Sequence, residues 1–136
     1  MWLLQDQNSN EKIYSKYYSP DPGLATVMSS SSHYDFEKAM VEYKNGEYAK
    51  HWKTWSALLK QNPGNDTLIY FIGAASQAKG DDDRAIENLQ QVAADSSSFF
   101  YKDACWYLGL SYLKKGDTKR AAEYIERSAT RKAQLS

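Results

Sequence analysis

The stretch WYLGLSYLKKGDTKRAAEYIERS, residues 106–128, contains two segments of helical apolar periodicity on either side of a Lys-Gly-Asp break. This arrangement predicts a helical hairpin. The glycine of the break, Gly116, has counterparts at Gly80 and Gly46, and the spacings along the chain are 36 and 34 residues. A fixed period of about 20 to 50 residues is typical of stacked repeats. The quoted stretch is therefore predicted to be the third copy of one helical hairpin.

Clusters of Gly, Pro, Asn, Asp and Ser divide the chain after Ser32 into six predicted helices. These helices span about Tyr34–Lys44, Tyr48–Gln61, Asp66–Lys79, Asp82–Ala94, Phe99–Lys115 and Thr118–Gln134. The preceding residues are polar, contain the breakers SPDPG and SSSS, and have no helical period. We therefore expect an irregular N-terminal arm over residues 1–31, followed by one all-α domain over residues 32–136.

Small residues recur at equivalent places in the three hairpins. The seventh residue before each turn glycine is Ala39, Gly73 or Gly109, and the fifth residue after the last two glycines is Ala85 or Ala121. Small residues at these places would let the two helices of a hairpin approach each other closely. The sequence thus indicates that each hairpin is tightly packed.

The period and these residues resemble the tetratricopeptide repeat, whose pattern is Leu-Gly-x-x-Tyr, then Ala-x-x-x-Phe and a closing Pro. The third copy carries Leu108, Gly109 and Tyr112, then Ala121 and Ile125 in the Ala and Phe places. The second is weaker, with Ile72, Gly73, Ala85 and Leu89 but Ser76 where Tyr is usual. The first is weakest: it has Ala39 for Gly, Tyr43 one place late, His51 where Ala is usual and Trp55 for Phe, and only Pro63 matches, as the closing Pro. The resemblance implies a right-handed array of three antiparallel helical hairpins, at about residues 32–65, 66–101 and 102–136.

His51 departs from the family pattern, which has alanine at this close-packing place. An imidazole ring there is expected to hold the first hairpin further open than alanine would. Tyr48, Trp52, Trp55 and Leu59 follow at helical spacing and predict a core stripe that could fill the gap.

The composition argues against several functional classes. Seventeen basic residues balance seventeen acidic residues, which is not typical of a nucleic-acid-binding protein. Cys105 lies in an apolar run and is predicted to be a core thiol, and His33 and His51 have no partners at metal-ligand spacing. No phosphate-binding loop or Ser-His-Asp order occurs. We therefore expect no catalytic residues, no cofactor and no metal.

In tetratricopeptide arrays, the first helix of each hairpin lines a concave groove that holds a segment of a partner. Phe36, Tyr70 and Trp106 each lie three residues before the small residue of their hairpin, so the resemblance implies a row of aromatic side chains along this groove. The alternative is that these rings fill the space between adjacent hairpins. The predicted binding residues are Phe36, Met40, Tyr43, Lys44, Tyr70, Gln77, Trp106, Leu110, Leu113 and Lys114.

The expected partner is another protein or a peptide, and the arm itself is a candidate occupant. Its segment YSKYYSPDPGLATVM, residues 14–28, carries Tyr17, Tyr18, Leu24 and Val27 on a backbone that two prolines restrict. The leading hypothesis is a non-catalytic protein-interaction module. The alternative is a self-associating element that uses an uncapped C-terminal repeat, where Tyr124 and Leu135 would remain uncovered. RNA binding through the basic last hairpin is a weaker third hypothesis.

The sequence contains no run of 18 or more apolar residues, so no membrane contact is expected of this segment. The opening residues Met1–Leu4 lack the features of a signal peptide. They are compatible with a cytoplasmic protein, or with a soluble, possibly periplasmic domain that follows a membrane-anchoring helix.

Overall fold

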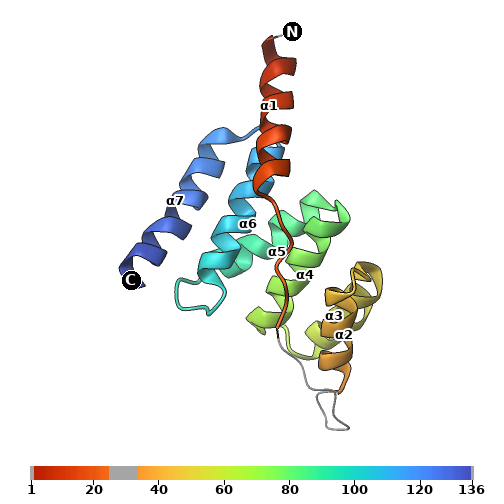
Figure 1. Cartoon of the computed structure of the whole chain (residues 1–136). Helices are drawn as coiled ribbons and strands as arrows, with labels where there is room; N and C mark the ends of the chain where they lie inside the picture. Colours follow the sequence, from red (N-terminus) through yellow and green to blue (C-terminus); the bar gives the residue numbers. More distant parts are fainter. Residues whose placement is uncertain (1, 25–33, 136) are drawn as a thin grey trace. The chain divides into compact units, whose positions relative to one another are not determined.

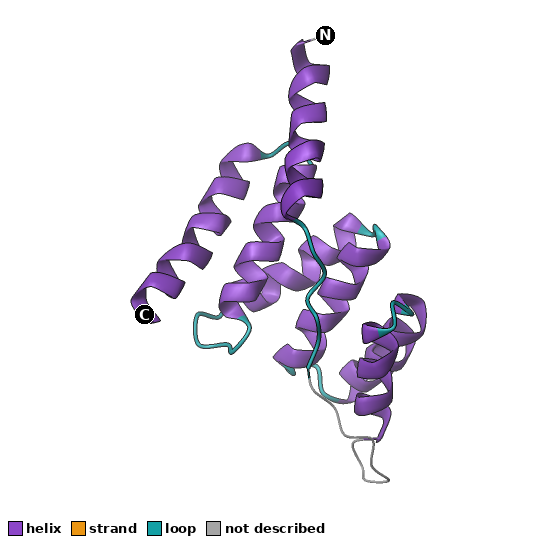
Figure 2. Cartoon of the chain, in the orientation of Figure 1, coloured by secondary structure: helices purple, strands orange, loops and turns teal. Residues whose placement is uncertain are grey.

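The computed structural model describes the backbone of residues 2–24 and 34–135 and the side chains of residues 9–24 and 34–129. In chain order its helices are α1 (Trp2–Tyr17), α2 (Tyr34–Lys44), α3 (Tyr48–Gln61), α4 (Asp66–Lys79), α5 (Asp82–Ala93), α6 (Tyr101–Lys114) and α7 (Thr118–Leu135) (Figure 1). All regular secondary structure in the described residues is helical (Figure 2). The prediction of an all-α chain is confirmed, and the six predicted helices agree closely with α2–α7.

Helix α1 corrects the prediction of an irregular arm. Residues 2–17 are helical, the segment from Tyr18 to Leu24 is extended or irregular, and residues 25–31 of the predicted arm lie outside the described residues. Tyr14 and Tyr18, one helical turn apart, stack with their ring centroids 5.0 Å apart. In Figure 1, α1 also lies against α6, and contacts join the two helices. Packing of its tyrosine-bearing face therefore stabilises a helix whose apolar period is weak.

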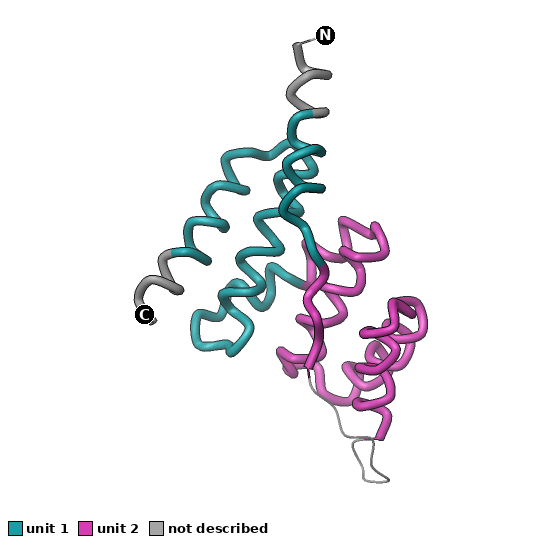
Figure 3. The backbone as a smooth tube through the Cα atoms, in the orientation of Figure 1, with its two compact units in different colours: residues 1–19, 89–136 teal, residues 20–88 magenta. Residues whose placement is uncertain are grey.

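The chain forms two compact units, Met1–Ser19 with Leu89–Ser136 and Pro20–Asn88 (Figure 3). The first unit contains α1, α6, α7 and the end of α5. The second contains α2, α3, α4 and the beginning of α5.

Three turns have the same hydrogen-bond geometry. Gly46, Gly80 and Gly116 follow α2, α4 and α6 with positive φ angles of 77°, 96° and 89°. The amide of each glycine donates to the carbonyl three residues earlier, and the next amide donates to the carbonyl five residues earlier. This is the Schellman motif, which favours glycine because the residue after the helix must adopt a left-handed backbone conformation. The predicted equivalence of the three turns is thus confirmed in the backbone.

The residues after these glycines are also equivalent. Each is acidic and forms an ion pair with the basic residue three positions later; the pairs are Glu47–Lys50, Asp81–Arg84 and Asp117–Arg120. In the last two turns, an aspartate oxygen also accepts a hydrogen bond from the backbone N–H of that arginine. Acidic residues at a helix start satisfy free N–H groups and complement the helix dipole.

In the second unit, α3 packs against both α2 and α4, and His51 links all three. The ring is fully buried, with Nδ1 2.9 Å from the Ala39 carbonyl oxygen on α2 and Nε2 3.3 Å from the Phe71 carbonyl oxygen on α4. Trp55 is also fully buried, and its ring centroid lies 4.4 Å from that of His51. His51 is therefore also a polar link between the helices, a role that the sequence did not predict. Trp52 is half-buried, and its ring centroid lies 4.5 Å from the Arg84 guanidinium.

His51 should make the stability of the protein depend on pH. Burial lowers the pKa of the imidazole below its ordinary value of 6.5, and the Ala39 and Phe71 carbonyl oxygens, which can both accept only from the protonated ring, oppose this in part. Below about pH 6.5 the unfolded chain therefore binds more protons at this site than the folded chain does. We expect the free energy of unfolding to decrease as the pH falls from about 7 to about 5. Urea unfolding at several pH values measures this, and His51→Gln should reduce the slope; an unchanged slope would assign it to other groups.

In the first unit, α6 packs against α7 and α1. A Cβ atom on Gly109 would lie 2.6 Å from Ile125 Cγ1 and 3.1 Å from the Ala121 carbonyl oxygen. The predicted close approach of the two helices of this hairpin is thus confirmed. Tyr124 is not uncovered, because its ring stacks on that of Tyr112 at 5.8 Å. The side chain of Leu135 lies outside the described residues.

Candidate functional site

The segment that follows α1 provides the candidate site. Its residues Pro20–Leu24 belong to the second unit, where they run alongside α4 (Figure 1). Three of them make hydrogen bonds or close contacts with side chains of α2 and α4. We call the four contacting side chains, Met40, Tyr43, Lys44 and Tyr70, the Asp21 seat.

Asp21 is the centre of these contacts. The Tyr70 hydroxyl donates a hydrogen bond of 2.6 Å to Asp21 Oδ2. The Tyr43 hydroxyl donates one of 2.7 Å to the Asp21 backbone carbonyl. Asp21 Oδ1 accepts the amide of Gly23 at 2.8 Å, which closes a local turn. One residue of the arm is therefore held by two helices and by its own backbone.

Gly23 fits a position that a larger residue would strain. Its φ is +87°, in the left-handed region, and a Cβ atom there would lie 3.0 Å from Met40 Sδ and 3.2 Å from Lys44 Cγ. The next amide, of Leu24, points to Met40 Sδ at 3.4 Å. The backbone of the arm thus comes close to α2, and the absence of a side chain at residue 23 allows it.

The core of the second unit fixes the two tyrosines of the seat. The Tyr43 ring makes edge contacts with Tyr48 and Phe71, and the Tyr70 ring makes one with Phe71, at centroid distances between 4.9 and 5.6 Å. Both rings are buried, Tyr43 with 2% of its surface exposed and Tyr70 with none. Since such packing restricts ring movement, the two hydroxyls are donors held at fixed places before a ligand binds.

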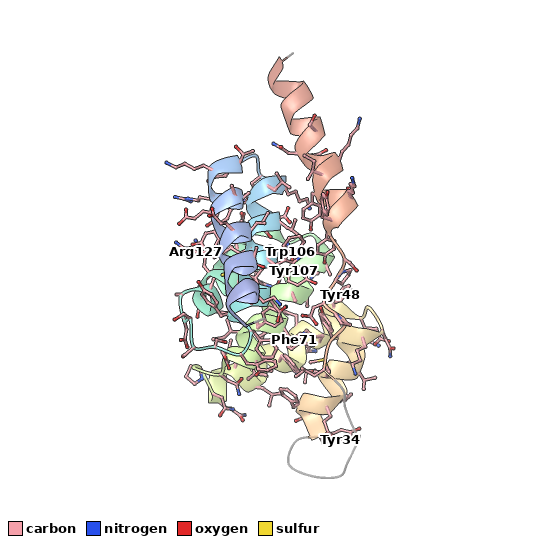
Figure 4. All side chains as sticks on the ribbon, turned by 60° about the vertical axis from the view of Figure 1, so that its left-hand side comes forward. Tyr34, Tyr48, Phe71, Trp106, Tyr107 and Arg127 are labelled. Carbon is pink, nitrogen blue, oxygen red and sulfur yellow. The ribbon has the colours of Figure 1, made fainter. Side chains whose placement is uncertain are left out.

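The first unit binds the preceding residues of the arm. The hydroxyl of Tyr107, on α6 (Figure 4), donates to the Ser19 carbonyl at 2.8 Å, and the Tyr18 ring meets the Tyr107 ring edge-on at 6.2 Å. The Lys114 ammonium lies 5.2 Å from the centroid of the Tyr14 ring on α1. In this unit, too, a tyrosine hydroxyl donates a hydrogen bond to the backbone of the arm, and its helix, α6, is the first of the two helices in its hairpin.

The structure divides the ten predicted binding residues between the units. Phe36, Met40, Tyr43, Lys44, Tyr70 and Gln77 belong to the second unit, and Trp106, Leu110, Leu113 and Lys114 belong to the first. Four of them form the Asp21 seat, and Lys114 contacts α1. Phe36 stacks on Trp55 at 4.6 Å inside its own hairpin. Gln77, Leu110 and Leu113 are buried, and Trp106 is half-buried.

Sequence reasoning missed Asp21, Ser19 and Tyr107, because it treated the arm as an apolar ligand. Of the apolar residues proposed there, Tyr18 and Leu24 are half-buried, whereas Tyr17 is 53% exposed. Val27 lies outside the described residues. The available signal was the Asp-Pro-Gly sequence, since Asp before such a pair often accepts a hydrogen bond from the backbone two residues on.

The chemistry of the seat is suited to binding. Two hydroxyl donors and a thioether acceptor hold a turn of the arm. Among the described residues, no group of three or more His, Cys, Asp or Glu side chains could hold a metal ion. Cys105 is fully buried, as predicted for a core thiol. None of the described helices has the length and apolarity needed to cross a membrane.

No protein-family model matches this sequence, and a search of curated proteins finds no significant match. The functional interpretation therefore depends on the geometry of the chain itself.

Proposed function

We propose that the protein is a non-catalytic interaction module that binds a peptide segment of another protein at the Asp21 seat. In the absence of that partner, its own N-terminal arm occupies the seat. The observation that carries the proposal is the pair of hydrogen bonds from the Tyr43 and Tyr70 hydroxyls to Asp21.

The proposed architecture is a tetratricopeptide-repeat-like, right-handed array of three antiparallel hairpins. Three equivalent Schellman turns and three equivalent ion pairs support it, at the 34- and 36-residue spacings of the turn glycines. The close approach at Gly109 supports it too, because the family has a small residue there. In such an array the seat belongs to the first helices of two successive hairpins.

The contacts of the arm are suited to release. Asp21 and Leu24 are only half-buried and Pro22 is exposed, so the arm itself buries little apolar surface in the seat. A segment with few buried contacts opens at a lower free energy than the core. Because it is covalently attached, the arm competes at an effective concentration on the order of millimolar. A partner segment would therefore bind when the arm is weakened or when the partner makes further contacts.

The test is binding of the arm peptide in trans. We expect a labelled peptide of residues 17–24 to bind the full-length Asp21→Ala chain at least about fivefold more tightly than the wild-type chain. The substitution removes the acceptor of the Tyr70 hydroxyl and so weakens the competitor. Fluorescence anisotropy measures the two affinities.

Hydrogen exchange on the same two chains is the control. Amides within α2, α3 and α4 should exchange equally in both, since Asp21→Ala changes only the occupant of the seat. Faster exchange throughout these helices would show that the arm is a structural cap of the second unit. Absence of peptide binding by either chain would contradict the interaction function.

A further inference from the structure

We propose that the Asp21 seat reads a specific turn, Asp-x-Gly, in a partner protein, where x is any residue. This inference rests on the proposed function and adds the chemical class of the ligand. The docked arm shows which groups the seat recognises. Asp21 is held by hydrogen bonds, Gly23 lies close to side chains of α2, and Pro22 is exposed.

The aspartate position requires a short carboxylate. One oxygen accepts the Tyr70 hydroxyl at 2.6 Å while the other accepts the Gly23 amide at 2.8 Å. Asparagine is uncharged and presents an amide NH₂ in place of one oxygen, so the charge-assisted hydrogen bond from the Tyr70 hydroxyl to a second oxygen is lost. Glutamate is longer by one methylene and would displace the carboxylate from the turn. The seat should therefore distinguish aspartate from both related residues.

The glycine position is restricted twice. The left-handed φ of +87° disfavours every residue with a Cβ atom. A Cβ atom would also approach Met40 Sδ at 3.0 Å and Lys44 Cγ at 3.2 Å. These side-chain atoms can shift, whereas the backbone strain remains. Alanine at this position should weaken binding even if Met40 and Lys44 adjust.

The side chain of the middle residue of the turn is not recognised by the seat. Pro22 is exposed, so its side chain contributes mainly by restricting the free peptide. The recognised backbone carbonyl belongs to the aspartate and is bound by the Tyr43 hydroxyl, which does not depend on the next side chain. A partner would thus be identified by its Asp-x-Gly turn and not by proline.

The experiment measures peptides of residues 17–24 against the full-length Asp21→Ala chain by fluorescence anisotropy. Relative to the parent peptide, Asp21→Asn or Gly23→Ala in the peptide should weaken binding at least about tenfold. Pro22→Ala in the peptide should weaken it by less than about threefold.

Variants of the seat complete the test. Adding Tyr70→Phe to the Asp21→Ala chain should weaken binding of the parent peptide about tenfold. The weak binding of the Asp21→Asn peptide should stay nearly unchanged, because Tyr70→Phe in the chain and Asp21→Asn in the peptide remove the same hydrogen bond. The matched control is Tyr34→Phe, the same change at an exposed tyrosine of α2, and it should have no effect.

The outcomes separate this inference from the function on which it rests. If the parent peptide and its Asp21→Asn and Gly23→Ala variants bind equally well, the seat does not recognise an Asp-x-Gly turn, although the interaction function stands. If no peptide binds, the interaction function itself fails. If the wild-type chain forms a concentration-dependent dimer that the parent peptide dissociates, the occupant is the arm of a second copy and the choice of a partner protein is overturned.

Discussion

Replacing Trp55 with alanine is expected to lower the free energy of unfolding by about 3–5 kcal/mol, as for other buried aromatic residues. Trp55 is fully buried in the second unit. Its ring lies 4.6 Å from Phe36, 4.4 Å from His51 and 5.7 Å from Phe71, measured between centroids. Its Nε1 donates to the Phe36 carbonyl at 3.2 Å. The substitution would leave a large cavity at the point where α2, α3 and α4 meet.

Trp52→Ala is the matched control, because it removes the same side chain from the same helix. Trp52 is half-buried, and its ring contacts the exposed guanidinium of Arg84. An exposed cation–π contact contributes only about 0.5–1 kcal/mol, so the expected loss is much smaller. Urea unfolding followed by circular dichroism measures both values. Equal losses would mean that the core stripe of α3 is assigned to the wrong face.

The sequence predicted the helices and turns well because both depend on local features. Gly46, Gly80 and Gly116 end helices through hydrogen bonds to carbonyls at most five residues away. The acidic residue after each glycine acts on the following helix start. Such signals are present in any short window of sequence, and their repetition revealed the period.

Helix α1 was missed for the opposite reason. Most of its residues are polar, and what stabilises it is contact with α6, which lies far along the chain. The tyrosines that pack, Tyr14 and Tyr18, are separated by one helical turn, but one such pair is a weak periodic signal. The absence of Gly and Pro before Pro20 was the remaining indication of a helix.

The candidate site was predictable only in part. Repeat equivalence indicated Tyr70, and helical spacing placed Tyr43 on the same face as Phe36. It could not indicate that Asp21 would join them, since residues 21 and 70 are brought together only by the fold. His51 shows the same limit. Its two carbonyl partners lie on α2 and α4, so its polar role depends on tertiary structure that the repeat pattern does not contain.

The second large effect is expected at Leu108 of α6, where alanine should lower the free energy of unfolding by about 2–5 kcal/mol. Leu108 is fully buried in the first unit. Its neighbour Gly109 already lies so close to α7 that an added Cβ atom would meet Ile125 and the Ala121 carbonyl. This close packing of α6 on α7 beside Leu108 limits how far the helices can shift when the leucine side chain is removed. A cavity that cannot collapse gives the larger losses seen for such substitutions.

Phe99→Ala provides the comparison, because it removes a larger apolar side chain that is 81% exposed and should change stability by no more than about 0.5 kcal/mol. Urea unfolding gives both values, and amide hydrogen exchange should show the Leu108→Ala effect in α6 and α7. A loss below about 1 kcal/mol for Leu108→Ala would mean that Leu108 does not fill the core at this position. The match of Leu108, Gly109 and Tyr112 to the repeat pattern would then fail, and the proposed array of three hairpins would lose its strongest copy.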